Sequence, residues 1–194
     1  LDAALLRPLP FPHGDHLVVL DGAYTPPPQG TPKIALDLTD WSAMRGTFDG
    51  VGAYVTGALN LVTPMGATRI TAAQVTPTLF DLLGAHASIG RSFTTVEGTP
   101  GHEDVVVLSD GFWHRQFGAA TNIVGHVITL ENQAFVVVGV MPNGFSFPQQ
   151  SDVWLPYAMP ELPGHMPLVH GGMTAVARLR PGRSIGEAQA AVSH

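Results

Sequence analysis

The residues best suited to metal chemistry are nine histidines, and the densest group of potential zinc ligands is His102, Glu103 and Asp104. These three residues lie in an expected loop, and no His-Glu-x-x-His sequence occurs anywhere in the chain. Six other histidines form pairs without a third ligand at a telling spacing: His13 with His16, His114 with His126, and His165 with His170. The pattern favours polar histidines on the surface over a metal site.

The sequence gives equally little support for a catalytic nucleophile or a nucleotide-binding loop. Ser109 follows an expected strand and precedes an expected helix, as the serine of a nucleophile elbow does, but the glycine two residues before it is absent, so a helix cap is favoured. The Gly50-Val51-Gly52 sequence resembles the start of a dinucleotide-binding loop, yet Val55 occupies the position of the third glycine. The single lysine, Lys33, belongs to no phosphate-binding loop. We assign no catalytic, cofactor-binding or metal residue, and we expect a protein that is not an enzyme.

The composition of the chain argues against some classes of partner and structure. Hydrophobic residues make up 45% of the chain and charged residues 12%, so the surface must contain much Gly, Pro, Thr, Ser and His. The net charge is -6, and the nine Lys and Arg residues are scattered, which argues against nucleic acid. No cysteine is present to form a disulfide, and no apolar stretch reaches the roughly 18 to 20 residues of a membrane span.

Short strands and helices alternate irregularly along the chain. Apolar runs bounded by Gly and Pro predict strands over 16–20, 51–62, 67–75, 105–108, 126–131, 134–140, 152–156 and 175–180. The strands over 126–131 and 134–140 are expected to form a hairpin across Asn132-Gln133, and the last strand alternates apolar and basic residues as a half-exposed strand does. Caps and three-to-four spacing predict helices over 38–45, 76–83 and 111–117. Thr76 is expected to cap the second and Gly84 to close it, and Gly118 is expected to close the third. Ser184 and Glu187 form a capping-box pair that opens a final helix. Because the two element types do not alternate strictly, the expected fold class is α+β.

Both ends of the sequence have the character of interrupted helices. Residues 1–6 form an apolar run that the prolines of residues 7–12 must stop, and residues 190–194 continue a helical pattern without a cap. We interpret residues 1–6 as the stump of a helix that the following prolines end.

Eight segments of the chain, taken in order, carry a recognisable pattern: residues 5–12, 75–84, 90–93, 107–118, 123–125, 136–142, 152–156 and 177–182. They cover nearly the whole chain and fall on caps, turns and buried aromatic positions, which specify a fold and supply no reactive group. Together these segments resemble the periplasmic core domain of MacB-type permeases of ABC transporters, in the wider FtsX/MacB permease family.

The resemblance implies a two-lobed mixed α/β architecture. Residues 1–12 would end the first transmembrane helix. Residues 13–75 together with 168–194 would form a discontinuous, split porter-like βαβ lobe. Residues 76–167 would form a second α/β lobe inserted into the first.

The resemblance also implies a function in export. The segment would be the periplasmic part of an inner-membrane permease, relaying motion from its own transmembrane helices and contacting cargo or partner proteins. A separate or fused cytoplasmic ATPase would supply energy, and the family pattern allows for a periplasmic adaptor and a homodimer. No cofactor is expected. One alternative is a ligand-binding sensor, whose pocket the Pro-rich loops and Gly98 to His102 would line; a weaker one is a histidine-dependent metal hydrolase.

Overall fold

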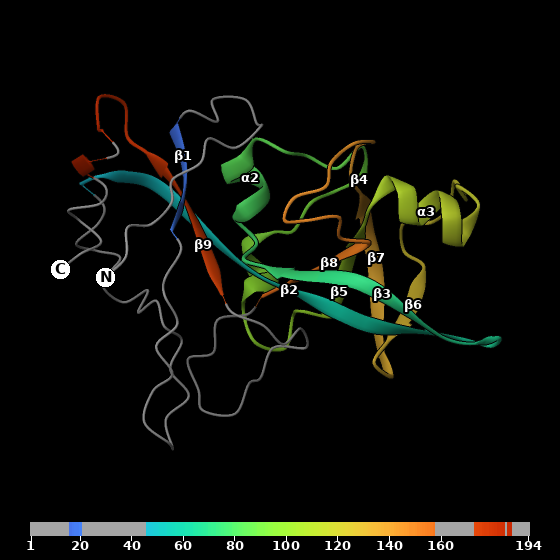
Figure 1. Cartoon of the computed structure of the whole chain (residues 1–194). Coiled ribbons are helices and arrows are strands. Elements are labelled where there is room, and N and C mark those ends of the chain that lie inside the picture. Colours follow the sequence, from blue (N-terminus) through green and yellow to red (C-terminus); the bar gives the residue numbers. More distant parts are fainter. Residues whose placement is uncertain (1–15, 21–45, 158–172, 185, 188–194) are drawn as a thin grey trace, which may run out of the picture.

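A computed structural model describes residues 16–20, 46–157, 173–184 and 186–187 of the chain. The described part is a mixed α/β domain that is rich in strands and has few helices (Figure 1). Its strands are β1 (Leu17–Leu20), β2 (Phe48–Thr63), β3 (Gly66–Val75), β4 (Ile89–Gly90), β5 (Val105–Leu108), β6 (Val127–Leu130), β7 (Gln133–Val140), β8 (Val153–Pro156) and β9 (Thr174–Leu179). Its helices are α2 (Leu79–Leu83), the short 3-10 helix η3 (Thr95–Gly98) and α3 (Asp110–Phe117).

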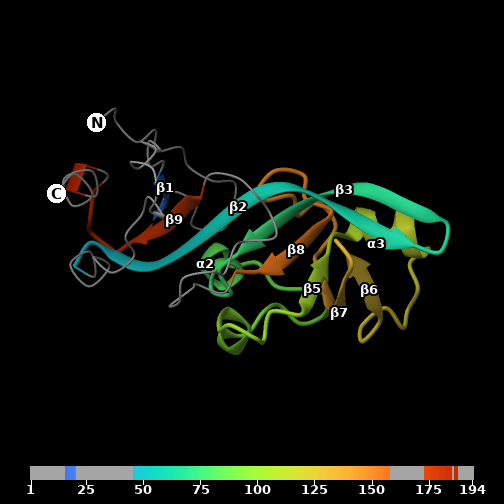
Figure 2. The same ribbon diagram turned by 90° about the horizontal axis from the view of Figure 1, so that it is seen from below.

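All nine described strands belong to one sheet with the order β1-β9-β2-β3-β8-β5-β7-β4, and β6 pairs with both β2 and β7. Most neighbours are antiparallel, but β3 pairs with β8 and β5 pairs with β7 in parallel. The sheet therefore mixes both kinds of pairing, as the predicted α+β class allows. In both views β1 and β9 lie at one end and the turn between β2 and β3 lies at the other (Figures 1 and 2).

The long hairpin of β2 and β3 is the backbone of the fold. Its ten registered pairs run from Tyr54 opposite Val75 to Thr63 opposite Gly66. The strands predicted over 51–62 and 67–75 are confirmed, and β2 begins earlier, at Phe48. Pro64 and Met65 form the turn, and Gly66 takes a φ of 126°, which a residue with a side chain rarely adopts.

The buried side chains form three clusters. The largest packs one face of the hairpin, including Leu59 and Ile70, against α3 and the strands β5 to β8. The second surrounds α2 and contains Phe80 and Trp154, whose ring centroids lie 6.1 Å apart. The third joins β1, β9 and the start of β2. The hairpin therefore contributes to every cluster.

The helix ends follow the predicted caps at three of four positions. The Ser109 hydroxyl accepts the Phe112 N–H at 3.1 Å, so the cap predicted for α3 is confirmed. Gly84 and Gly118 close α2 and α3 with left-handed φ values of 66° and 57°, as expected. The cap predicted at Thr76 is wrong. Its hydroxyl accepts the Ala53 N–H at 2.9 Å, across the hairpin, and α2 begins only at Leu79.

Two strand predictions need correction. The β6–β7 turn was expected at Asn132-Gln133, but Glu131 and Asn132 form it, with φ values of 46° and 67° that match the twist of a two-residue hairpin. Strand β9 was expected to be half exposed. Instead residues 175–177 are buried, because β9 lies between β1 and β2 with a core cluster on each face.

Other predictions fall partly or wholly outside the described residues. The helix over 38–45, the Pro-rich segments, the membrane-helix exit over 1–12 and the body of the final helix lie there. The capping pair predicted for that helix is present, since the Glu187 carboxylate accepts the Ser184 N–H at 2.7 Å. In the described part of the chain, no helix has the length and apolar character that crossing a membrane requires. The lobe boundaries stay a prediction.

Candidate functional site

The residues that most resembled catalytic motifs have structural roles in the fold. Ser109 caps α3 through its hydroxyl, as described above. Gly50 and Gly52 lie inside strand β2, where they allow α2 to pack closely. A Cβ on Gly52 would come within 2.7 Å of the Leu79 Cδ1, so the glycine serves the contact between strand and helix.

The described histidines take part in local contacts. The His102 Nδ1 lies 3.2 Å from the Thr99 hydroxyl, and the His114 Nδ1 lies 2.9 Å from the Asp110 carbonyl oxygen, one turn earlier in α3. Across the described ranges, no three His, Asp or Glu side chains gather closely enough to hold a metal ion. His13, His165 and His170 lie outside those ranges.

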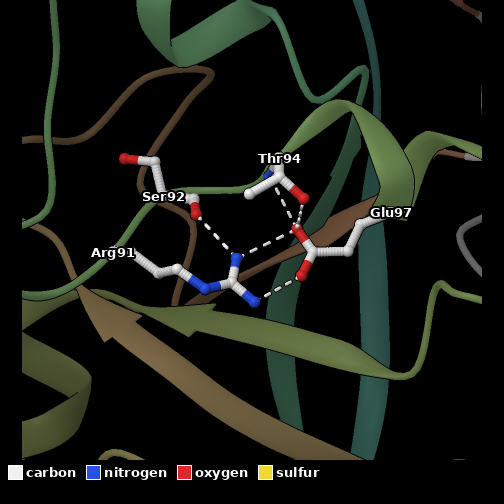
Figure 3. Close-up of polar contacts among 4 residues, drawn as sticks. All are labelled: Arg91, Ser92, Thr94 and Glu97. Carbon is white, nitrogen blue, oxygen red and sulfur yellow. Dashed lines mark hydrogen bonds and ion pairs between the residues drawn. The ribbon is translucent and has the colours of Figure 1, made fainter.

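The tightest polar network joins the loop after β4 to η3 (Figure 3). Arg91 donates two hydrogen bonds to the Glu97 carboxylate, from Nη1 to Oε2 at 3.0 Å and from Nη2 to Oε1 at 2.5 Å. The Thr94 N–H and hydroxyl also donate to Oε2, at 2.6 and 3.2 Å, which completes a capping box. A bidentate arginine pair of this kind fixes both position and orientation.

This network keeps Glu97 ionised although only 6% of the residue is exposed. Burial alone raises the pKa of Glu97, but the hydrogen bonds from Arg91 and Thr94 and the positive charge of Arg91 outweigh burial, so the pKa lies below its ordinary value. The hydrogen bond to Glu97 raises the pKa of Arg91, against the opposing effect of burial. Both groups stay charged and engaged, so the pair braces the loop.

The rest of the 90–93 segment also serves the fold. Gly90 has a φ of 71°, and a Cβ there would lie 2.2 Å from the Val138 carbonyl oxygen, so only glycine fits beside β7. Phe93 is buried, with its ring centroid 5.6 Å from that of Phe80. The segment that carried part of the sequence resemblance therefore specifies packing.

The best candidate for a contact site is the distal arm, which we define as residues 60–71. Carboxylates hold it at both edges. Glu131 donates its N–H to the Asn60 carbonyl at 3.0 Å and accepts the Asn60 N–H on Oε1 at 2.7 Å. Asp152 does the same at Thr71, with both distances 3.0 Å. Each acidic residue thus makes the two hydrogen bonds that a residue of a neighbouring strand would make. We call these two contacts the clamps of the arm.

Beyond these two clamps the arm is open to solvent. Residues 64–69 are all exposed, and Met65 at the turn is 96% exposed. Arg69 is the only charged residue between Asp49 and Asp81. An apolar tip beside an isolated cation is a surface that can contact another molecule.

A cavity of about 320 Å³ lies beside the arm, and no charged side chain lines it. Its lining residues are Thr56, Gly57, Thr71, Ala72, Gln149, Gln150 and Ser151. The pocket expected from Gly98 to His102 is therefore not this cavity, and the Pro-rich loops around residues 26–32 and 160–167 lie outside the described residues.

Comparison with known proteins identifies the fold. The periplasmic region of MacB from Actinobacillus actinomycetemcomitans is similar in structure, with a TM-score of 0.62 and 17% identity over 79% of this chain and 68% of that one. The extracellular domain of the noncanonic ABC-type transporter YknZ from Gram-positive bacteria has a TM-score of 0.58 and 16% identity, over 77% and 76% of the two chains. No curated protein matches the sequence. Residues 5–194 match the family described as MacB-like periplasmic core domain.

The chain belongs to the MacB-like periplasmic core domain family. The resemblance noted from the sequence is thereby confirmed. Membership makes this chain an extracytoplasmic segment of a membrane permease in an ABC-transporter context.

Three polar features of this MacB-like domain were not predicted from the sequence: the Arg91–Glu97 pair, the isolated Arg69, and the contacts of Glu131 and Asp152 with the arm. The Arg91–Glu97 brace had a readable signal, because Thr94 and Glu97 have the spacing of a capping box. Arg69 also had one, as the lone charge in a long neutral stretch. The clamps of Glu131 and Asp152 had none, because their partners are 71 and 81 residues away along the chain.

Proposed function

We propose that this domain relays motion from the membrane helices of its permease to a contact surface at the distal arm. The observation that carries the proposal is the length of β2. This strand pairs with β9 through Phe48 to Tyr54 and continues without interruption into the arm. Its 16 residues span about 50 Å at the usual rise per residue.

The predicted two-lobe architecture gives this relay two bodies. The third core cluster supports the porter-like lobe, because all its buried members fall within residues 13–75 and 168–194. The largest cluster supports an inserted lobe over 76–167, on which the arm packs through residues such as Leu59 and Ile70. We propose that the hairpin carries motion from the first lobe onto the second.

Energy and partners come from outside the domain in this proposal. A separate or fused cytoplasmic ATPase drives the membrane helices, and a homodimer of the full-length permease sets two such domains side by side. The domain contacts export cargo or a periplasmic adaptor and performs no catalytic step itself. What supports this division is the family membership together with polar networks that are engaged in holding the fold.

The relay can be tested by spin labels in the full-length permease. These 194 residues contain no cysteine, so Met65→Cys and Arg183→Cys, introduced singly or together, place labels at the arm tip and at the turn after β9, once any cysteine elsewhere in the permease is replaced. We expect the Met65–Met65 distance between protomers to change when the ATPase binds nucleotide. The distance from Met65 to Arg183 within one protomer should stay constant if β2 acts as a rigid connection. A fixed distance between protomers, or a changing one within the protomer, contradicts the relay.

Ligand sensing is the alternative, and the observation that favours it is the uncharged cavity beside the arm. A sensor should bind a neutral, hydrogen-bonding ligand at Thr56 and Gln150. A thermal-shift screen of neutral polar compounds, with Thr56→Val as the control variant, separates the two functions. A stabilising compound that loses its effect in Thr56→Val favours the sensor.

A further inference from the structure

The outer edge of β3 has backbone groups whose direction can be deduced. In a strand, the N–H and C=O of one residue point to the same side, and the side alternates from residue to residue. Both groups of Thr71 bond Asp152, on the side away from β2. The N–H and C=O of Arg69 and Ala67 must therefore point away from β2 as well.

The other strand of the hairpin gives the same answer independently. Asn60 lies opposite Arg69, and the N–H and C=O of Asn60 bond Glu131 on the far side of β2. A pair in which one residue points its groups outward is a pair without mutual hydrogen bonds. Arg69 must therefore also point its groups outward.

The two edges of the arm are treated differently. On the β2 edge, Leu61 and Val62 pair with β6. On the β3 edge, β8 pairs only with Ala72 to Val75, and Asp152 closes Thr71. No described residue pairs with Ala67 or Arg69 on that side, and residues 66–69 are exposed. Open strand edges of this kind accept further strands.

Charge indicates which kind of strand fits. The Arg69 guanidinium forms no ion pair with a described carboxylate, and it lies on a chain whose net charge is -6. A second copy of the chain, paired antiparallel about Thr68, would place two Arg69 side chains on the same short edge and bring two acidic domains together. A strand with a carboxylate opposite Arg69 would gain a cross-strand pair instead.

We propose that the β3 edge from Ala67 to Arg69 is a strand-addition site for an extended, acidic segment of a partner protein. The added strand continues the sheet on the side of β3 that β8 occupies further along, with backbone hydrogen bonds to Ala67 and Arg69 and a carboxylate at the Arg69 guanidinium. This proposal rests on the partner-contact part of the function above and names the chemistry of the partner.

The probe is a pair of capped peptides in which threonine and valine alternate, with glutamate at the centre of one and lysine at the centre of the other. Each is added at millimolar concentration to the 194-residue chain, and amide shifts and hydrogen exchange are followed by NMR. With the glutamate peptide, we expect shift changes confined to residues 66–71 and slower exchange at Ala67 and Arg69. The glutamate peptide should bind about two- to fivefold more tightly than the lysine peptide, the range expected for one cross-strand charge pair.

Two variants separate the backbone contribution from the charge. Ala67→Pro removes an outward N–H that β2 does not use, so the hairpin should fold and peptide binding should be lost. Arg69→Glu keeps the backbone groups and should reverse the preference in favour of the lysine peptide. Arg183→Glu, at an exposed arginine in the turn after β9, is the matched control and should change neither result.

Several outcomes overturn the proposal. They are shift changes away from residues 66–71, no peptide preference, unchanged preference in Arg69→Glu, and binding of neither peptide. Exchange protection at Ala67 and Arg69 in the free chain also overturns it, because the edge is then already covered. Protection that rises with protein concentration identifies a second copy as the occupant. The spin-label distances do not depend on strand addition, so a failure of either proposal can be recognised separately.

Discussion

Two arginines in two surface regions of this domain differ in their contacts. Arg91, in the loop after β4, holds the buried Glu97 with two hydrogen bonds, and its side chain keeps 48% of its exposure. Arg69, in the distal arm, is exposed and forms no ion pair with a described carboxylate. The first region satisfies its polar groups internally, whereas the second leaves a cation and a strand edge open.

The sequence segments that carry the resemblance lie outside the arm, where we propose the contact surface. A buried carboxylate without its partner is costly, so the brace around Glu97 tolerates little change. An exposed edge has no such cost and can take whatever side chains a partner requires. The segments that carry the sequence resemblance specify the fold, whereas the arm carries the proposed contact surface.

Replacing a glycine with alanine should give the largest difference in lost stability between the two regions. In Gly90→Ala, the Cβ would lie 2.2 Å from the Val138 carbonyl, at a φ of 71°. Clash and backbone strain together should cost about 3 kcal/mol or more. Gly66→Ala, in the arm, meets no atom within 4 Å and should cost less, about 1 to 2 kcal/mol, because only the backbone strain at its φ of 126° opposes it. Urea unfolding measures both, and equal losses would contradict the close approach of β4 to β7.

Removing a charged side chain from each region should give the next largest difference in unfolding free energy. Glu97→Ala leaves Arg91 and the Thr94 N–H without their acceptor and should cost about 2 kcal/mol of unfolding free energy, less than for a fully buried pair because Arg91 is half exposed. Arg69→Ala should stay within about 0.5 kcal/mol of the original chain. Similar losses in the two variants would mean that Arg69 has a partner in the folded domain.

Acid should weaken the brace and leave the arm unchanged. The pKa of Glu97 is lower in the folded chain than its ordinary value of 4.5, so the unfolded chain binds that proton more readily. Its contribution is complete above pH 4.5 and is lost as the pH falls through the folded pKa. Urea unfolding between pH 5 and pH 3 should show a smaller loss of stability in Glu97→Gln. An identical pH dependence in the two proteins would contradict the role of this carboxylate.

The clamps should show the smallest effect on global stability, with a local signature. Asp152→Ala removes the acceptors of the Thr71 N–H and of Arg115, and should cost about 1 kcal/mol. Glu131→Ala should act in the same way at Asn60. Amide exchange should accelerate at Thr71 in the first variant and at Asn60 in the second, while exchange at Gly90 and Arg91 stays unchanged. Faster exchange throughout the domain would show that the arm and the brace are one cooperative unit.

Much of the local structure could be predicted from sequence. The β2–β3 hairpin connects strands that are adjacent in sequence through a short turn, and the Ser109 cap and the glycines that close α2 and α3 depend on residues within a few positions of one another. The misplaced β6–β7 turn and Thr76 cap have a different cause. Glu131 hydrogen-bonds Asn60, and the Thr76 hydroxyl accepts the Ala53 N–H. At both positions, hydrogen bonds to a strand distant in sequence replace the local turn or cap.

By itself the sequence determined the family, the α+β class, the caps and the lack of any motif with reactive spacing, because these depend on residue type and short-range order. Only the tertiary structure decided that Arg91 holds Glu97 as a bidentate pair, that β9 is buried on both faces, and that Ala67 and Arg69 face outward from β3. Each of these depends on which strand lies alongside, and strand neighbours are set by packing between segments far apart in the chain.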